Sequence, residues 1–107
     1  TKNIIATLKG DKDSKPIILC CHMDTVTPGE GIKPVIKDEV IYSDGTTILG
    51  GDNKAGIAAI VEALKIIKEE NICHGDIEVV FTIAEEGGLN GSKNLGKSLD
   101  LKSNSIW

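Results

Sequence analysis

The chain has 107 residues, a formal net charge of -4 and a hydrophobic content of 40%. This length allows one ordinary domain, and this apolar content is too high for a disordered chain. No apolar run approaches the roughly 18–20 residues that cross a bilayer, no signal peptide is visible, and the lysines are interleaved with acids, so we expect neither a membrane nor a nucleic acid as partner.

Cysteine usage favours a reducing compartment. The three cysteines include the adjacent pair Cys20 and Cys21, and no CxxC motif is present. This count and spacing suit neither a disulfide framework nor a structural zinc site. We therefore expect Cys20, Cys21 and Cys73 to act as small apolar residues, and we expect a cytoplasmic location.

The first half of the chain predicts strands and turns. Residues 4–8 form a short β-type run, and the polar residues 9–15 that follow are typical of a hairpin turn. Residues 17–21 are a continuous apolar run, which indicates a strand buried on both faces. Residues 27–31 form a loop, and residues 32–45 predict two short strands, in a hairpin expected to lie over the polar strand ends described below.

The second half predicts a helix between two strands. Small and aliphatic residues recur at helical spacing over residues 53–70, and residues 76–84 form a second apolar strand. A glycine-rich loop then leads to a short helix over residues 92–99 and a strand beginning near Ser105. Because a strand–helix–strand unit makes a parallel sheet, we predict an α/β fold, three-layer α/β/α with a mixed, mainly parallel sheet that is incomplete at Trp107.

Polar side chains that bind metals occur at three places next to these elements. They are His22 and Asp24 after the first buried strand, Asp52 before the long helix, and Glu85 and Glu86 after the second strand. Loops beyond the carboxyl ends of parallel strands share one edge of the sheet, so we expect these side chains to converge. One imidazole with several carboxylates suits zinc, or manganese and cobalt.

Each of these signals also has a plainer interpretation. His22 alone is more often a structural histidine, Asp52 at a helix start is often an N-cap, and a glutamate pair before glycines is often a solvated loop. The shared position of the three signals favours the metal site. Asp24 lies two residues from His22 in extended chain and is expected to accept its second ring proton. Of the neighbouring glutamates, one is free to bind metal while the other serves as a general base.

Other chemistry is less well supported. His74 lies in a predicted turn and is expected to be exposed. The glycines of residues 45–56 lack the lysine and serine or threonine of a phosphate-binding loop, and no GxSxG nucleophile elbow is present. Cys21 and His22 are neighbours in a strand and face opposite ways, which argues against a thiol–imidazole pair.

Three stretches carry a family resemblance. They are HMDTVTPGEG at residues 22–31, TTILGGDNKAGIAAIVEAL at residues 46–64 and FTIAEEGGLNGSKNL at residues 81–95. Together they closely resemble the peptidase T-like members of the co-catalytic zinc exopeptidase family, which also includes acetylornithine deacetylase, succinyl-diaminopimelate desuccinylase and glutamate carboxypeptidase. The resemblance covers nearly all of the chain, in order and at matching spacing.

The resemblance implies a role for each polar residue. His22 matches a ligand of one zinc ion, Glu86 matches a ligand of the second, and Asp52 matches the carboxylate that bridges both. Asp24 matches the aspartate that holds the imidazole, and Glu85 matches the general base. A cis peptide bond after Asp52 is also implied.

The resemblance further implies a longer protein. The family uses another aspartate ligand, a final histidine ligand and a lid domain, none of which is present, so we expect residues 1–107 to be the N-terminal part of the catalytic domain, without the lid domain and C-terminal half. The implied activity is hydrolysis of the N-terminal peptide bond of short peptides, tripeptides above all, with two Zn²⁺ per site and Co²⁺ or Mn²⁺ as substitutes.

Three matters stay open at this point. A deacylase or dipeptidase of the same family, or a non-catalytic binding module that keeps the fold, fits the sequence as an alternative. The 107 residues by themselves are expected to be inactive, because each zinc ion lacks a ligand. A short peptide is the expected substrate, and a homodimer of the full-length parent is the oligomeric state to test.

Overall fold

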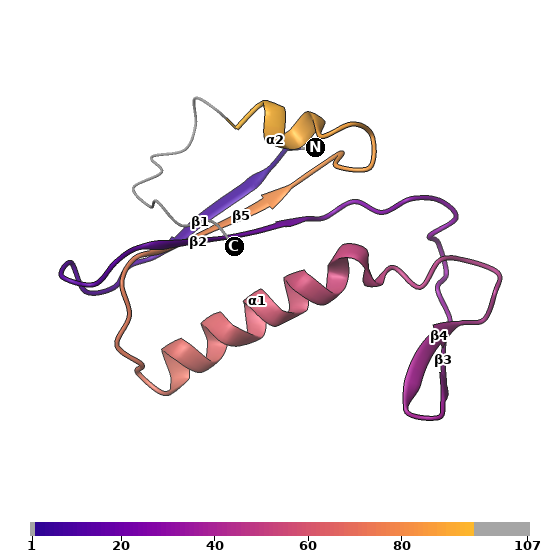
Figure 1. The fold of residues 1–107 in the computed structure, drawn as a ribbon, viewed down its shortest axis with the longest axis horizontal. Helices are drawn as coiled ribbons and strands as arrows, with labels where there is room; N and C mark the ends of the chain where they lie inside the picture. Colours follow the sequence, from indigo (N-terminus) through magenta and orange to yellow (C-terminus); the bar gives the residue numbers. More distant parts are fainter. Residues whose placement is uncertain (1, 96–107) are drawn as a thin grey trace.

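The computed structural model describes residues 2–95 of the chain (Figure 1). The strand predicted near Ser105 and the second half of the helix predicted over residues 92–99 lie outside these residues. The described elements are, in chain order, β1 (Ile4–Leu8), β2 (Ile17–His22), β3 (Pro34–Lys37), β4 (Val40–Ser43), α1 (Gly51–Glu69), β5 (Ile77–Thr82) and α2 (Asn90–Lys93). Among the described residues, neither helix combines the length and apolarity that a membrane span requires.

The main sheet has three strands in the order β1-β5-β2. β2 runs parallel to β5 and is joined to it through α1, which confirms the predicted strand–helix–strand unit. β1 runs antiparallel to β5. The hairpin expected between β1 and β2 is therefore wrong, because β5 lies between them. β5 is the most buried strand and has buried residues on both faces, so it takes the central position where each face and each edge is covered.

The core is centred on β2 and β5, with α1 packed against β2. Ile18, Ile77, Val79 and Val80 are each at most 3% exposed. Figure 1 shows α1 along one side of the three strands and α2 on the other. The mixed sheet between helices confirms the predicted α/β class, although the described strands form one parallel and one antiparallel pair instead of a mainly parallel set.

Strands β3 and β4 form the predicted hairpin, with Asp38 and Glu39 as its two-residue turn. Both turn residues have positive φ, 51° and 62°, as a type I′ turn requires. The hairpin stands beside the body, past the N-terminal end of α1, so its expected position over the strand ends is wrong (Figure 1). Its side chains are largely exposed, and Ile36 reaches 75%.

Two turns meet closely at the end of the sheet that lies away from the polar strand ends. The Asp11 N–H donates to the His74 carbonyl oxygen at 2.7 Å. A Cβ atom on Gly75 would lie 2.4 Å from the Lys15 carbonyl oxygen, which no side chain can do without moving the backbone. Gly75 is therefore required for the contact that closes this end.

Replacing Gly75 tests this close approach. We expect Gly75→Ala to lower the free energy of unfolding by about 1–3 kcal/mol, because the added methyl group must displace the turn before β2. The matched control is Gly51→Ala, since a Cβ atom there would meet no atom within 4 Å. Urea unfolding of the full-length gene product measures both, and equal transitions for the two variants would contradict the expectation.

Candidate metal centre

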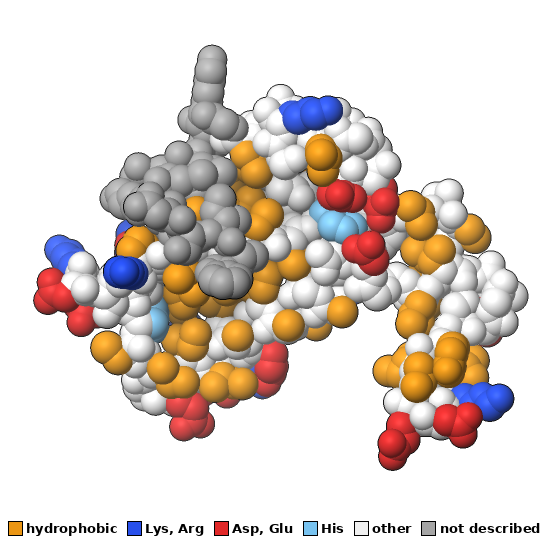
Figure 2. Space-filling view, viewed as in Figure 1, with side chains coloured by type: hydrophobic (Ala, Val, Ile, Leu, Met, Phe, Trp, Pro, Cys, Tyr) orange, Lys and Arg blue, Asp and Glu red, His pale blue; other side chains and the backbone are white. Residues whose placement is uncertain are grey.

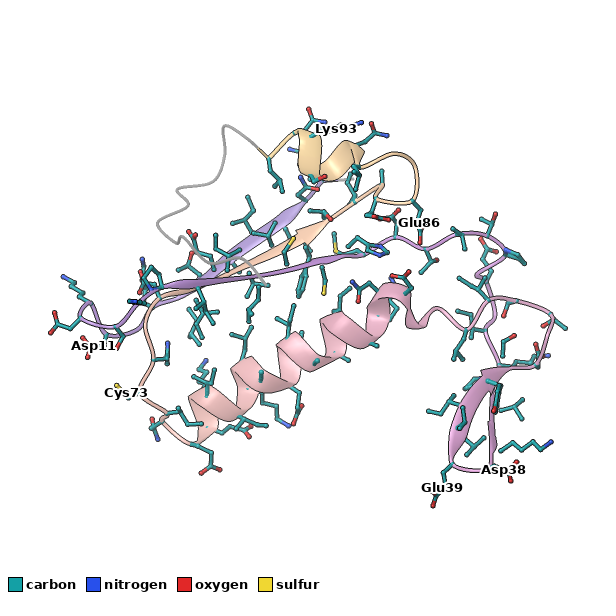
Figure 3. The ribbon with its side chains drawn as sticks, viewed as in Figure 1. Asp11, Asp38, Glu39, Cys73, Glu86 and Lys93 are labelled. Atoms are coloured by element: carbon teal, nitrogen blue, oxygen red, sulfur yellow. The ribbon has the colours of Figure 1, made fainter. Side chains whose placement is uncertain are left out.

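The parallel pairing of β2 and β5 brings the polar strand ends together. His22, the last residue of β2, pairs with Thr82, the last residue of β5, so both chains leave the sheet at the same edge. α1 begins beside that edge. Ligand atoms of His22, Asp52 and Glu86 all lie within 4.8 Å of one another. Figure 2 shows acidic side chains gathered next to a histidine, and Figure 3 shows Glu86 beside the ends of both strands.

Both nitrogens of the His22 ring are engaged, and the ring is only 8% exposed. Nδ1 lies 2.9 Å from the main-chain carbonyl oxygen of Asp24. A carbonyl oxygen can only accept, so Nδ1 carries the proton of this hydrogen bond. Nε2 lies 2.9 Å from Oδ1 of Asp52. The ring is thus held so that Nε2 points at the carboxylates, which is the orientation that a metal-binding imidazole needs.

Asp24 orients the ring through its main chain, and its carboxylate has a different partner. Its Oδ1 lies 3.7 Å from His22 Nδ1, beyond hydrogen-bond length, so the expected carboxylate–imidazole bond is wrong. The two carboxylate oxygens instead accept the N–H groups of Glu85 at 3.0 Å and Glu86 at 3.2 Å. The bond from the Glu85 N–H, followed by that from Glu86, holds the pKa of Asp24 below its usual value. The ionised side chain fixes the main chain of both glutamates.

Asp52 is not the cap of the long helix. Asp52 and Asn53 have non-helical backbone angles, and the peptide bond between them is cis, as the family resemblance implied. The side chain of Asn53 accepts the N–H of Gly56 at 3.2 Å, so Asn53 is the N-cap of the regular helix. Asp52 is left free to point at His22, with its side chain 82% exposed. The sequence did indicate this cap, because asparagine is a common N-cap residue and Asn53 lies three residues before Gly56.

The two glutamates occupy different environments in the turn after β5. Glu86 is exposed and its carboxylate belongs to the three-residue group. Glu85 is half-buried and lies within electrostatic reach of His22, whose pKa it raises. The turn is closed by the Gly88 and Leu89 N–H groups, which donate to the Glu85 carbonyl oxygen at 3.0 and 2.9 Å. The Glu86 carboxylate therefore belongs to the group with His22 and Asp52, and that of Glu85 does not.

The remaining sequence candidates lie apart from this group. His74 is half-buried, not exposed as expected, and its Nδ1 lies 2.6 Å from the Gly75 carbonyl oxygen at the opposite end of the sheet. Cys20 and Cys21 are half-buried, and burial raises the pKa of both thiols, which fits the expected apolar role. Cys73 is exposed, so that role is wrong for it.

The electrostatic interactions of His22 predict that the stability of the metal-free protein depends on pH. Burial lowers the pKa of His22, but the hydrogen bonds to Asp52 and Asp24 and the charges of Glu85 and Asp52 outweigh burial, so the net pKa is raised above 6.5. In metal-free protein, the stability from the charged ring is therefore fully present below pH 6.5 and is lost as the pH rises through the raised value.

Substituting Asp52 tests this balance. We expect Asp52→Asn to lower the pKa of His22, since the charged hydrogen-bond acceptor is lost while burial remains. Asp38→Asn, the same chemical change on the distant hairpin, should leave that pKa unchanged. NMR titration of the imidazole in chelator-treated protein measures both variants, and an unchanged pKa in Asp52→Asn would show that Asp52 does not face the ring.

The cap assignment gives a separate stability prediction. We expect Asn53→Ala to lower the free energy of unfolding by about 1 kcal/mol, whereas Asn53→Asp keeps a cap acceptor and most of the stability. Urea unfolding distinguishes the two. Unchanged stability in Asn53→Ala would show that Asn53 does not cap the helix.

Residues 3–106 match peptidase family M28. The chain is 55% identical over 97 residues to the uncharacterized protein YqjE of Bacillus subtilis, covering 91% of this chain and 26% of that protein. It is 53% identical over 90 residues to peptidase T of Pasteurella multocida, covering 82% of this chain and 22% of that protein. The chain thus spans about a quarter of the length of these relatives.

Two solved structures share the fold. The aminopeptidase PepT from Bacillus cereus superposes with a TM-score of 0.83 at 56% identity, and a tripeptidase from Staphylococcus aureus superposes with a TM-score of 0.82 at 48% identity. Each likeness covers 88% of this chain and 26% of the solved chain. The family match and these likenesses together show that the chain belongs to peptidase family M28 and is peptidase T-like.

Proposed function

We propose that the full-length gene product is a zinc-dependent aminopeptidase that hydrolyses the N-terminal peptide bond of short peptides, with tripeptides as the preferred substrate. The observation that carries this proposal is the convergence of His22, Asp52 and Glu86 within 4.8 Å at the ends of two parallel strands. The names of the solved relatives, an aminopeptidase and a tripeptidase, support the substrate class. Residues 1–107 are proposed to be the N-terminal part of the catalytic domain, in a cytoplasmic protein.

The donor set fits a borderline divalent cation. A neutral His22 ring with its proton on Nδ1 presents a lone pair on Nε2, beside the carboxylates of Asp52 and Glu86. Imidazole nitrogen with carboxylate oxygen is a ligand set that zinc accepts, as do cobalt and manganese. We propose that two ions bind, with His22 on one, Glu86 on the other and Asp52 on both. The remaining ligands are proposed to come from the rest of the protein, so this part alone is proposed to be inactive.

We propose Glu85 as the residue that moves a proton in this reaction. Zinc, when bound, lowers the pKa of a water and polarises a carbonyl group. We propose that the Glu85 carboxylate takes one proton from the attacking water, whose oxygen bonds to the carbonyl carbon. As the carbon–nitrogen bond breaks, Glu85 returns that proton to the leaving amine. Asp24 supports this role because it holds the Glu85 main chain at 3.0 Å.

Separate substitutions of the two glutamates test their proposed division of roles. In the full-length gene product, we expect Glu85→Gln to lower kcat on a tripeptide by about 10²–10⁴-fold while zinc content stays normal. Glu86→Gln should lower zinc content as well as kcat. The matched control is Glu69→Gln, at the far end of α1, which should change neither. Steady-state kinetics and metal analysis on the same samples give both readouts.

Two outcomes would contradict the assignment. Normal turnover in Glu85→Gln removes the base role, and normal zinc content in Glu86→Gln removes the ligand role. A panel of a tripeptide, a dipeptide and an acylated amino acid then tests the substrate class. Faster turnover of the second or third substrate would favour the dipeptidase or deacylase alternative, and absence of zinc and turnover in the wild type would favour a non-catalytic module.

A further inference from the structure

Asn3 lies just before β1, far along the chain from the metal centre, yet its side chain holds the loop that carries both glutamates. Its Nδ2 donates to the Gly91 carbonyl oxygen at 2.8 Å, and its Oδ1 accepts the Ile83 N–H at 3.1 Å. Ile83 is the first residue after β5 and Gly91 lies in the first turn of α2, so these two contacts bound the loop that contains Glu85 and Glu86. One amide group therefore bridges the base of this loop.

The contact is close and leaves no space for adjustment. The loop ends also bond to each other, with the Gly91 N–H donating to the Ile83 carbonyl oxygen at 2.9 Å. A Cβ atom on Gly91 would lie 2.1 Å from that oxygen and 2.7 Å from Oδ1 of Asn3. Gly91 is buried at this point. A shift of Asn3 would therefore also move Ile83 and Gly91.

Asn3 extends the support that the sheet gives to β5. The ladder between β1 and β5 ends at the pair Ile4 and Phe81, so the Ile83 N–H lies beyond it. The Asn3 side chain accepts the hydrogen bond from that N–H, because the ladder offers no main-chain acceptor from β1 at this position. The site requires a donor and an acceptor in one short side chain, because it faces an N–H and a carbonyl oxygen together.

We propose that Asn3 is a positioning residue, which sets the direction in which the chain leaves β5 and thereby places the carboxylates of Glu85 and Glu86 relative to His22. This inference rests on the proposed function. Asp24 holds the middle of the same loop through the N–H groups of both glutamates, and Asn3 holds its two ends. Within residues 2–95, the Asn3 side chain bonds to the main chain of Gly91 and Ile83. We therefore expect it to act through the glutamates and not on the substrate.

Two variants of Asn3 in the full-length gene product test the proposal. Asn3→Asp is close in shape and keeps an acceptor for Ile83, but it turns an oxygen toward the Gly91 carbonyl, and Asn3→Ala loses both bonds. We expect both variants to lower kcat by roughly 10- to 100-fold at unchanged KM, because a small displacement of a catalytic group is costly. The control is Asn94→Ala, which removes a 2.7 Å bond to the carbonyl oxygen of Asn90, the first residue of α2, and should leave kcat unchanged.

A second measurement separates positioning from stability and from the proposed function. Amide hydrogen exchange in zinc-free protein should be faster over residues 83–91 in both Asn3 variants and unchanged over β2. Normal kcat in the folded variants, or normal exchange in the loop, would overturn the proposal. If Glu85→Gln keeps full turnover, the proposed function fails, and the exchange result still decides whether Asn3 holds the loop.

Discussion

The register between β2 and β5 is the constraint on which the candidate metal centre depends. His22 pairs with Thr82, and the Met23 N–H continues the ladder to the Thr82 carbonyl oxygen at 2.7 Å, so both chains turn away from the sheet at the same level. His22 then faces the side on which α1 begins and reaches Asp52. A slip of one residue would turn the imidazole to the opposite face and separate it from every carboxylate. Burial of Ile18 and Val80 makes such a slip costly.

Asp24 links the end of β2, which carries His22, to the loop that carries Glu85 and Glu86. Its carbonyl oxygen fixes the His22 ring, and its carboxylate fixes the main chain of Glu85 and Glu86. The result is a nearly buried imidazole among several carboxylates. Burial lowers its pKa, but the hydrogen bonds to Asp52 and Asp24, together with the nearby carboxylate charges, raise it by more. In this setting a divalent cation would relieve the mutual repulsion of the carboxylates, which is why the arrangement suits a metal-dependent hydrolase.

Local pattern was sufficient for most elements. The apolar runs at residues 17–21 and 76–84 and the helical spacing after Asn53 predicted β2, β5 and α1, since burial imposes its period on the sequence. The chain order of these elements predicted the parallel pairing, and that pairing predicted convergence of the polar strand ends. The predictions about which elements lie side by side in space were the ones that failed in the fold. β1 pairs with β5 and not with β2, and the β3–β4 hairpin stands beside the centre.

The sequence by itself therefore determined the element types, the parallel crossover and the residues that gather at the strand ends, because these follow from apolar periodicity and chain order. Only the tertiary structure decided that Asn53 caps α1 in place of Asp52, that Asp24 binds the glutamate main chain, and that Asn3 holds their loop. Each of these is a hydrogen bond whose partner is selected by the local direction of the backbone. Residue type and spacing specify which groups can bond, and only packing in three dimensions selects which of them do.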